Sequence, residues 1–276
     1  MKSRSGVAAI LRIVVLAVVC VAVVFPVLVM LSNSFKPSDD LFVKGLNLIP
    51  RRVTLDNYGV AWTQYEVPRW FLNSVGTTVG ITLLQMCIYV LGAYGLVFFD
   101  FKGKNFWFGF FVASMIVPFQ ATMIPNYILI SKAGLLNTWA AVILPSVASA
   151  FGIFLLRQNF MTFPHALYEA ALLEGCNSWQ ILWKIVVPVT KASISALAIV
   201  SFIDAWNLYF WPLLVMNTPE SQTLSTGLQQ FIDYEMGSRW GPFMATATLA
   251  CLPTLIIYFI MQREIISTYA NSGLKG

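Results

Sequence analysis

The sequence predicts an all-α polytopic membrane protein, and three observations carry this prediction. Hydrophobic residues make up 58% of the 276 residues and charged residues only 11%, which is too little charge to coat a soluble globule. Apolar runs long enough to cross a bilayer as helices recur along the chain. Basic residues are concentrated in the segments on one side of these runs. We therefore expect one membrane domain over residues 1–276, with six transmembrane helices, both termini cytoplasmic and a cytoplasmic helical hairpin between helices 4 and 5.

Six apolar segments are the expected spans, at about residues 7–31, 71–99, 106–130, 138–156, 192–216 and 243–261. The first meets Asn33-Ser34-Phe35-Lys36 instead of a small-residue cleavage site, so we interpret it as a retained span. The polar segment 37–69 is long enough to hold a small amphipathic helix.

The third span contains two prolines, Pro118 and Pro125, with Gln120 between them. Proline kinks a helix and frees backbone carbonyls, which a membrane tolerates only against protein or a wet cavity. Two interpretations stay open at this point. The prolines either produce a packing kink or mark a segment that lines a pathway, with Gln120 as a candidate pathway residue.

The charge distribution supports this orientation. With the hairpin inside, the cytoplasmic segments hold ten of the 17 basic residues against four of the 12 acidic residues, a net charge of +6. The outer segments hold seven of each, and Asp204 lies within a span. A basic excess in the inner loops is the usual pattern of membrane proteins. The scattered positive charge of +5 forms no cluster, so nucleic acid is not an expected partner.

The segment 157–190 has the pattern of a soluble helical hairpin between two apolar spans. Good helix formers follow Pro164 as far as Gly175, where a positive φ would end the first short helix. Asn177 or Ser178 can cap a second helix, which carries an apolar stripe and ends near Pro188; the stripe comprises Trp179, Ile181, Leu182 and Ile185. We interpret the hairpin as a docking element.

The order Glu-Ala-Ala, three residues, Gly, and then a hydrophobic helix ending in Pro resembles the EAA loop of ABC importer membrane subunits. In that family this loop plugs into a cleft of the ATP-hydrolysing subunit. The resemblance therefore implies a set of ATPase-coupling residues, namely Glu169, Ala170, Ala171, Glu174, Gly175 and Pro188. Four further segments resemble the carbohydrate branch of the family, the relatives of the maltose and glycerol-3-phosphate permeases: Ser34–Lys36, Gln158–Met161, Ala205–Leu213 and Gly273–Gly276.

The resemblance also implies the partners. They are a second and non-identical permease subunit, two ATP-binding subunits, an extracellular or periplasmic substrate-binding protein, and membrane lipid. The implied location is the bacterial cytoplasmic (inner) membrane, as a multi-pass protein. The outer loop 217–241 would reach into the binding protein, with Gly227, Gln229, Gln230 and Phe231 as contact residues.

The chain shows no catalytic motif. It contains no G-x-x-x-x-G-K-[ST], no G-x-S-x-G and no H-E-x-x-H sequence, so it has no phosphate loop or hydrolase site of its own. We expect no cofactor on this chain, with ATP and magnesium on the partner ATPase. The four separated cysteines and the lone His165 predict neither a disulfide nor a metal site.

A polar and aromatic group in span five is the candidate substrate site. Asp204, Asn207 and Trp211 are spaced i, i+3 and i+7, which places them on one helix face, and Tyr209 lies nearby. Rings and amides suit a sugar, and an acid at membrane depth usually faces a cavity or a partner. The alternative is that Tyr209 and Trp211 lie at the membrane interface while Asp204 or Asn207 joins helices. In the maltose system, moreover, the partner subunit supplies the sugar contacts.

Two functional hypotheses from different classes remain. The first is a permease subunit of an ATP-driven importer for a sugar or oligosaccharide, with glycerol-3-phosphate or another polyol derivative as the rival substrate. The absence of Lys or Arg deep in a span argues against a phosphate. The second is an ion-coupled secondary carrier, which would be expected to have buried charge pairs and no docking hairpin.

Overall fold

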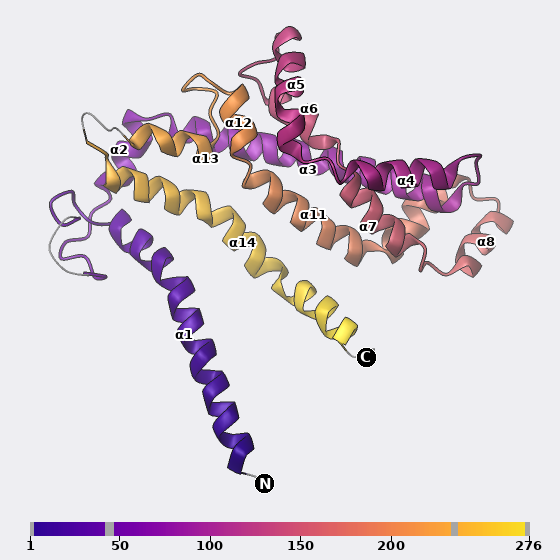
Figure 1. Ribbon diagram of the computed structural model, residues 1–276, viewed down its shortest axis with the longest axis horizontal. Coiled ribbons are helices and arrows are strands. Elements are labelled where there is room, and N and C mark those ends of the chain that lie inside the picture. The colour runs from indigo at the N-terminus through magenta and orange to yellow at the C-terminus, as the bar shows by residue number, and fades with distance from the viewer. Residues whose placement is uncertain (1–2, 42–46, 233–236, 274–276) are drawn as a thin grey trace. The chain divides into compact units, whose positions relative to one another are not determined.

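The computed structural model describes residues 3–41, 47–232 and 237–273, and side chains within 8–41, 47–232 and 237–260. The chain divides into two compact units, described separately below: residues 1–68 with 227–253, and residues 69–226 with 254–276. Every regular element in the described ranges is helical (Figure 1).

The first unit contains α1 (Ser3–Ser34), α2 (Asp56–Gln64) and the beginning of α14 (Trp240–Gly273). Helix α2 is the small helix expected between the first two spans. It is fixed by Asn57, whose buried amide donates to the carbonyl oxygens of Ser34 at 3.0 Å and Lys36 at 2.7 Å. From Ala8 onward, most of α1 is exposed apolar surface, because nothing within this unit covers it.

The second unit is built along α3 (Val67–Phe98), and the remaining helices follow in chain order: α4 (Lys104–Ser114), α5 (Phe119–Lys132), α6 (Trp139–Val147), α7 (Ala150–Phe160), α8 (His165–Leu173), α9 (Ser178–Ile181), a π-helical turn (Leu182–Val186), α10 (Val187–Val189), α11 (Lys191–Trp206), α12 (Phe210–Val215) and α13 (Leu224–Gly227).

Glycines let α3 approach α6 and α7 very closely. A Cβ atom on Gly76 would lie 2.4 Å from the Trp139 ring, and one on Gly80 would lie 2.7 Å from Ile143. On α7, a Cβ atom on Gly152 would lie 2.1 Å from the ring of Tyr89. Small residues at this spacing are the usual means of close helix packing in lipid, where backbones must come near one another.

Three helices are long and apolar enough to cross a membrane, over Ala8–Ser34, Val67–Phe98 and Trp240–Ile260. The other three candidate spans in the described residues are bent helix pairs. Three of the spans expected as continuous helices are broken, and one of them, at 192–216, becomes α11 and α12. The span at 106–130 becomes α4 and α5 at 95° to one another, and the span at 138–156 becomes α6 and α7 at 46°.

The sharp break in the third span has a local cause. In a continuous helix the ring of Pro118 would clash with the carbonyl of Ser114, and α4 ends at Ser114. Pro118 itself is extended, with φ −66° and ψ 138°, and caps α5. We expected a kink here, and the structure shows two separate helices at 95° to one another.

Candidate functional site

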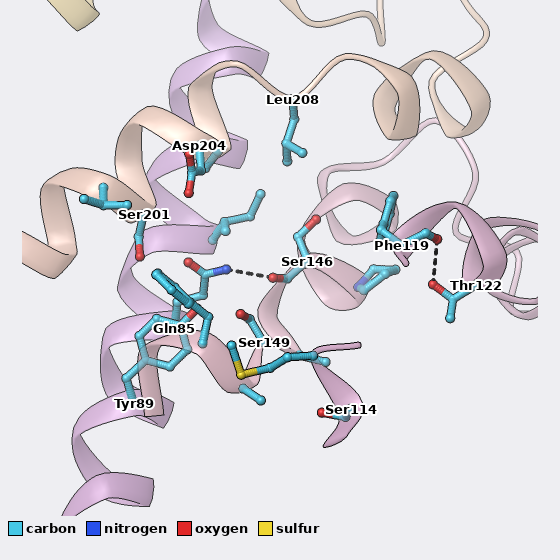
Figure 2. A pocket seen from close by; sticks show the side chains of 18 of the residues that line it. Gln85, Tyr89, Ser114, Phe119, Thr122, Ser146, Ser149, Ser201, Asp204 and Leu208 are labelled. Atoms are coloured by element: carbon cyan, nitrogen blue, oxygen red, sulfur yellow. Dashed lines mark hydrogen bonds between the residues drawn. The ribbon is translucent and has the colours of Figure 1, made fainter. Parts of the chain in front are cut away.

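A cavity of about 840 Å³ opens in the second unit, where the broken helices meet α3 and α11 (Figure 2). Its walls come from α3, from the α4–α5 and α6–α7 junctions, and from α11; the polar residues that line it are Gln85, Tyr89, Ser114, Thr122, Ser146, Ser149, Ser201 and Asp204. Apolar side chains, among them Met115, Phe119 and Phe151, complete the lining. The cavity thus has the mixed apolar and hydrogen-bonding surface that ligand sites share.

The helix breaks supply some of the polar groups of the cavity. Helix α6 ends at Val147, so its last carbonyls have no partner within the helix. The Gln85 side chain donates to the Ser146 carbonyl at 2.8 Å and satisfies one of them. Tyr89 on α3, Ser149 at the α6–α7 junction and Ser201 on α11 line the same cavity. The Gln85 bond joins α3 to the α6–α7 junction, and Figure 2 shows it together with Tyr89, Ser149 and Ser201 in the cavity lining.

Asp204 is the acidic member of the cavity lining. It lies one turn after Ser201 on α11, and Figure 2 shows both side chains on the same side of the cavity. Asp204 is exposed in this chain. Neither Lys nor Arg nor His occurs among the described lining residues, so the chain offers no cation there to offset the carboxylate.

The other predicted members of this group do not line the cavity. Helix α11 ends at Trp206, and Asn207 caps it while its side chain donates to the Ile203 carbonyl at 2.8 Å. The i, i+3, i+7 face therefore does not form, because the helix stops before Trp211. Tyr209 lies in the break and makes an edge contact with the Phe210 ring. Gln120 is exposed on the first turn of α5, and its neighbour Phe119 lines the cavity instead.

Trp211 is a core residue, a position that neither the substrate-site prediction nor the membrane-interface alternative gave it. It is 1% exposed and its indole N–H donates to the carbonyl of Ala141 at 3.0 Å. That carbonyl has no helical donor because residue 145, four positions later, is a proline. Trp211 therefore satisfies the acceptor that Pro145 leaves open.

The hairpin at 157–190 is formed largely as predicted. Helix α8 ends at Leu173, and Gly175 adopts a φ of 78°. The Gly175 N–H donates to Leu172 O and the Cys176 N–H to Ala171 O, both at 3.0 Å, which is the pattern of a Schellman motif.

The second helix starts with a capping box. Asn177 Oδ1 accepts from the Gln180 N–H at 2.9 Å, and Gln180 Oε1 accepts from the Asn177 N–H at 3.0 Å. At Thr190, just beyond Pro188, the chain turns by 81° into α11.

The hairpin has a buried base and an exposed tip. Ala171, Ile181, Leu182 and Val186 are at most 3% exposed and join a core with α3 and α7. The Leu173 side chain, in contrast, is 89% exposed; the acidic residues Glu169 and Glu174 are exposed on the same helix or at its cap, as is Ala170. Trp179, expected in the apolar stripe, is 61% exposed and makes an edge contact with Trp183. An apolar and acidic surface thus projects from a fixed base.

The segment after α12 is held by amide side chains. Asn73 on α3 donates to the carbonyls of Glu220 and Gln222, both at 2.9 Å, and accepts from the Trp139 indole at 2.8 Å. Asn137, at a φ of 62°, accepts from the Asn217 N–H at 2.6 Å. The first half of the predicted outer loop is therefore anchored to α3 and to the α5–α6 connection.

The four predicted binding-protein contacts lie beyond this anchored part, in the first unit. Gln229 and Gln230 are exposed there, whereas Gly227 and Phe231 are buried. The Phe231 ring packs 4.2 Å from that of Tyr65. Residues 233–236 of the loop lie outside the described residues.

Residues 88–267 match the family model of the binding-protein-dependent transport system inner membrane component. The chain belongs to this family. It is 33% identical over 262 residues to the arabinooligosaccharides transport system permease AraQ of Halalkalibacterium halodurans, with 92% of this chain and 91% of the relative covered. It is 36% identical to the lactose transport system permease LacG of Rhizobium radiobacter, over 79% of each chain. The sn-glycerol-3-phosphate permease UgpE of Brucella abortus is 30% identical, over 91% of each chain.

A solved structure shows the same fold. It is described as a bacterial ABC transporter involved in the import of the acidic polysaccharide alginate, with a TM-score of 0.85 and 22% identity over 95% of this chain and 97% of the other. The protein is thus a membrane subunit of an ABC importer without an ATPase site of its own, and membership of this family excludes the ion-coupled carrier. The matched range runs from the cavity wall on α3 through the hairpin and α11.

Proposed function

We propose that this permease subunit forms, with a second membrane subunit, the pathway by which an ATP-driven importer moves a sugar or oligosaccharide. The observation that carries the proposal is the cavity beside α11, in which hydroxyl, amide and aromatic groups alternate with apolar side chains. Sugars present C–H faces to such rings and hydroxyls to such polar groups. Relatives named for arabinooligosaccharides and lactose support a sugar over the glycerol-3-phosphate of a third relative.

The proposed topology has six spans in one membrane domain with both termini cytoplasmic. Three straight helices and the bent pairs provide the spans, and the inner basic excess orients them. The bacterial cytoplasmic membrane is the proposed location. The exposed apolar length of α1 would face lipid and the second, non-identical permease subunit.

The hairpin is the proposed contact with the ATP-binding subunits. Its exposed residues Leu173, Glu169 and Glu174 would enter the cleft of one ATPase, and the buried base would pass the ATPase movement to α3, α7 and α11. Gly175 would set the turn between its two helices, and Pro188 the turn into α11. ATP and magnesium belong to those partner subunits.

The exposed glutamines Gln229 and Gln230 would meet the extracellular or periplasmic binding protein. The buried Gly227 and Phe231 would support that surface from beneath. Anchoring by Asn73 and Asn137 gives this loop a fixed starting point on the spans.

Substitution of Leu173 by glutamate tests the coupling role. The tagged subunit would be purified from membranes that contain all partners, and the co-purifying ATPase and the sugar uptake would be measured. We expect Leu173→Glu to reach normal abundance in the membrane and to lose both the ATPase and uptake, since a charge replaces an exposed apolar contact. The matched control is Ile49→Glu, an exposed apolar residue of the first unit, which should retain the ATPase. Retention of the ATPase and uptake by Leu173→Glu would refute the proposed contact.

A further inference from the structure

Among the described residues that line the cavity, the charged side chains are all negative. Asp204 supplies a carboxylate, and Lys, Arg and His are missing from the lining. The other polar groups there are neutral: the Gln85 amide, the Tyr89 phenol, and serine and threonine hydroxyls. Low-dielectric walls concentrate the electric field of charges of one sign that line a cleft. The field raises the local concentration of solutes of opposite charge.

We propose that Asp204 is a specificity-determining residue, which makes the cavity exclude anionic substrates and admit uncharged sugars. A carboxylate accepts hydrogen bonds from sugar hydroxyls, and bonds to a charged acceptor are the stronger kind. The Gln85 side chain and the serine hydroxyls can accept and donate on the remaining hydroxyls. An uncharged sugar thus finds partners on several walls without bringing a charge of its own.

A phosphate or uronate in the same place would bring a second negative charge to the cavity. This chain has no cationic side chain in the lining to pair with it. A like charge without compensation costs free energy in a partly desolvated site. The cavity would therefore disfavour anions such as those for which the glycerol-3-phosphate relative and the alginate transporter are named.

The proposal rests on the proposed function only in requiring that the substrate passes through this cavity. The negative field that it assigns to the cavity can be measured without knowing the sugar. In the complete complex, Cys20, Cys87, Cys176 and Cys251 would be replaced by alanine, and Ser149→Cys would place a thiol in the cavity wall. The reaction rates of this thiol with a trimethylammonium-ethyl and a sulfonato-ethyl methanethiosulfonate would be compared with those of a free thiol in solution.

We expect the ratio of the cationic to the anionic reaction rate to be about tenfold or more above the same ratio for the free thiol. The negative field of the cavity attracts one reagent and repels the other. Adding Asp204→Asn should return the ratio to near that of the free thiol. The matched control is Asp100→Asn, which removes an exposed carboxylate outside the cavity and should leave the ratio unchanged. Ser114→Cys, on a different wall, serves as a second reporter if the first variant does not assemble.

An equal preference for the two reagents, or a preference that Asp204→Asn leaves unchanged at both reporter positions, would overturn the assignment. Neither result depends on transport. Conversely, a complex that assembles with its ATPase and takes up no sugar would contradict the proposed function whatever its rate ratio. The two failures are therefore distinguishable in the same preparations.

Discussion

The turn at Gly175 offers a clean test of the hairpin because backbone conformation is the only local variable. Gly175 has a φ of 78°, and a Cβ atom added there would meet nothing within 4 Å. A larger side chain therefore causes no clash with its surroundings. Its cost comes from the left-handed conformation, about 1–2 kcal/mol for an ordinary residue.

Gly175→Val should therefore lower the ratio of formed to unformed turn by a factor of about 5 to 30. The Schellman hydrogen bonds to Ala171 and Leu172 depend on that conformation. We expect the variant to insert and to pair with its partner subunit, since the turn lies outside the spans. Sugar uptake should fall by up to that factor, because the two short helices no longer hold their angle when the ATPases close.

Gly175→Asn is the matched control. Asparagine adopts the left-handed conformation at lower cost than other residues with a side chain, and open space around the position accommodates it as easily as valine. It should therefore retain most of the uptake. Membrane abundance, co-purified ATPase and uptake would be measured together. Normal uptake by the valine variant, or equal loss in both variants, would refute the reasoning.

Two further predictions concern side-chain packing in the second unit. Gly152→Ala should displace the Tyr89 ring, which would lie 2.1 Å from the new Cβ; at an overpacking cost of about 1–3 kcal/mol, we expect lower thermal stability of the detergent-solubilised complex and lower uptake. Trp211→Phe should remove the donor to the buried Ala141 carbonyl and cost about 1–3 kcal/mol, which thermal unfolding of the same preparation would detect.

Each of these substitutions has a control elsewhere in the chain. Gly109→Ala changes a helical glycine on α4 with nothing within 4 Å of a new Cβ, so it should leave stability unchanged or slightly higher. Trp62→Phe changes an indole that is 55% exposed and should be nearly neutral. Thermal stabilities of Gly152→Ala and Trp211→Phe that match those of their controls would contradict the packing described for Tyr89 and Trp211.

The hairpin could be predicted from the sequence because its determinants are local. Gly175 supplies the positive φ, Asn177 and Gln180 are three residues apart as a capping box requires, and the structure shows both features. Burial was harder to predict. Trp179 was expected on the buried stripe and is exposed, because a helix of four residues is too short for periodicity to define its buried face.

The cavity could be predicted only in part. Asp204 was identified from its charge within a span, whereas Gln85, Ser146 and Ser149 were missed. Serines and a single glutamine are common in membrane helices, where they join neighbouring helices, so their presence alone does not indicate a site. What brings them together is the set of helix breaks, and these depend on contacts between segments far apart in the sequence.

The break between α11 and α12 follows from two prolines on different helices. In a continuous helix Pro212 would clash with the carbonyl of Leu208, and α11 ends shortly before it. Pro145 on α6 leaves the Ala141 carbonyl without its helical donor, and the break allows the Trp211 indole to turn inward and supply one. The effect of Pro212 could be predicted from the sequence. The effect of Pro145 could not, because Trp211, which donates to the Ala141 carbonyl, is 70 residues away from Ala141. Loss of the face shared by Asp204 and Trp211 is therefore a consequence of satisfying a buried acceptor, and Asp204 is left facing the cavity with neutral groups around it.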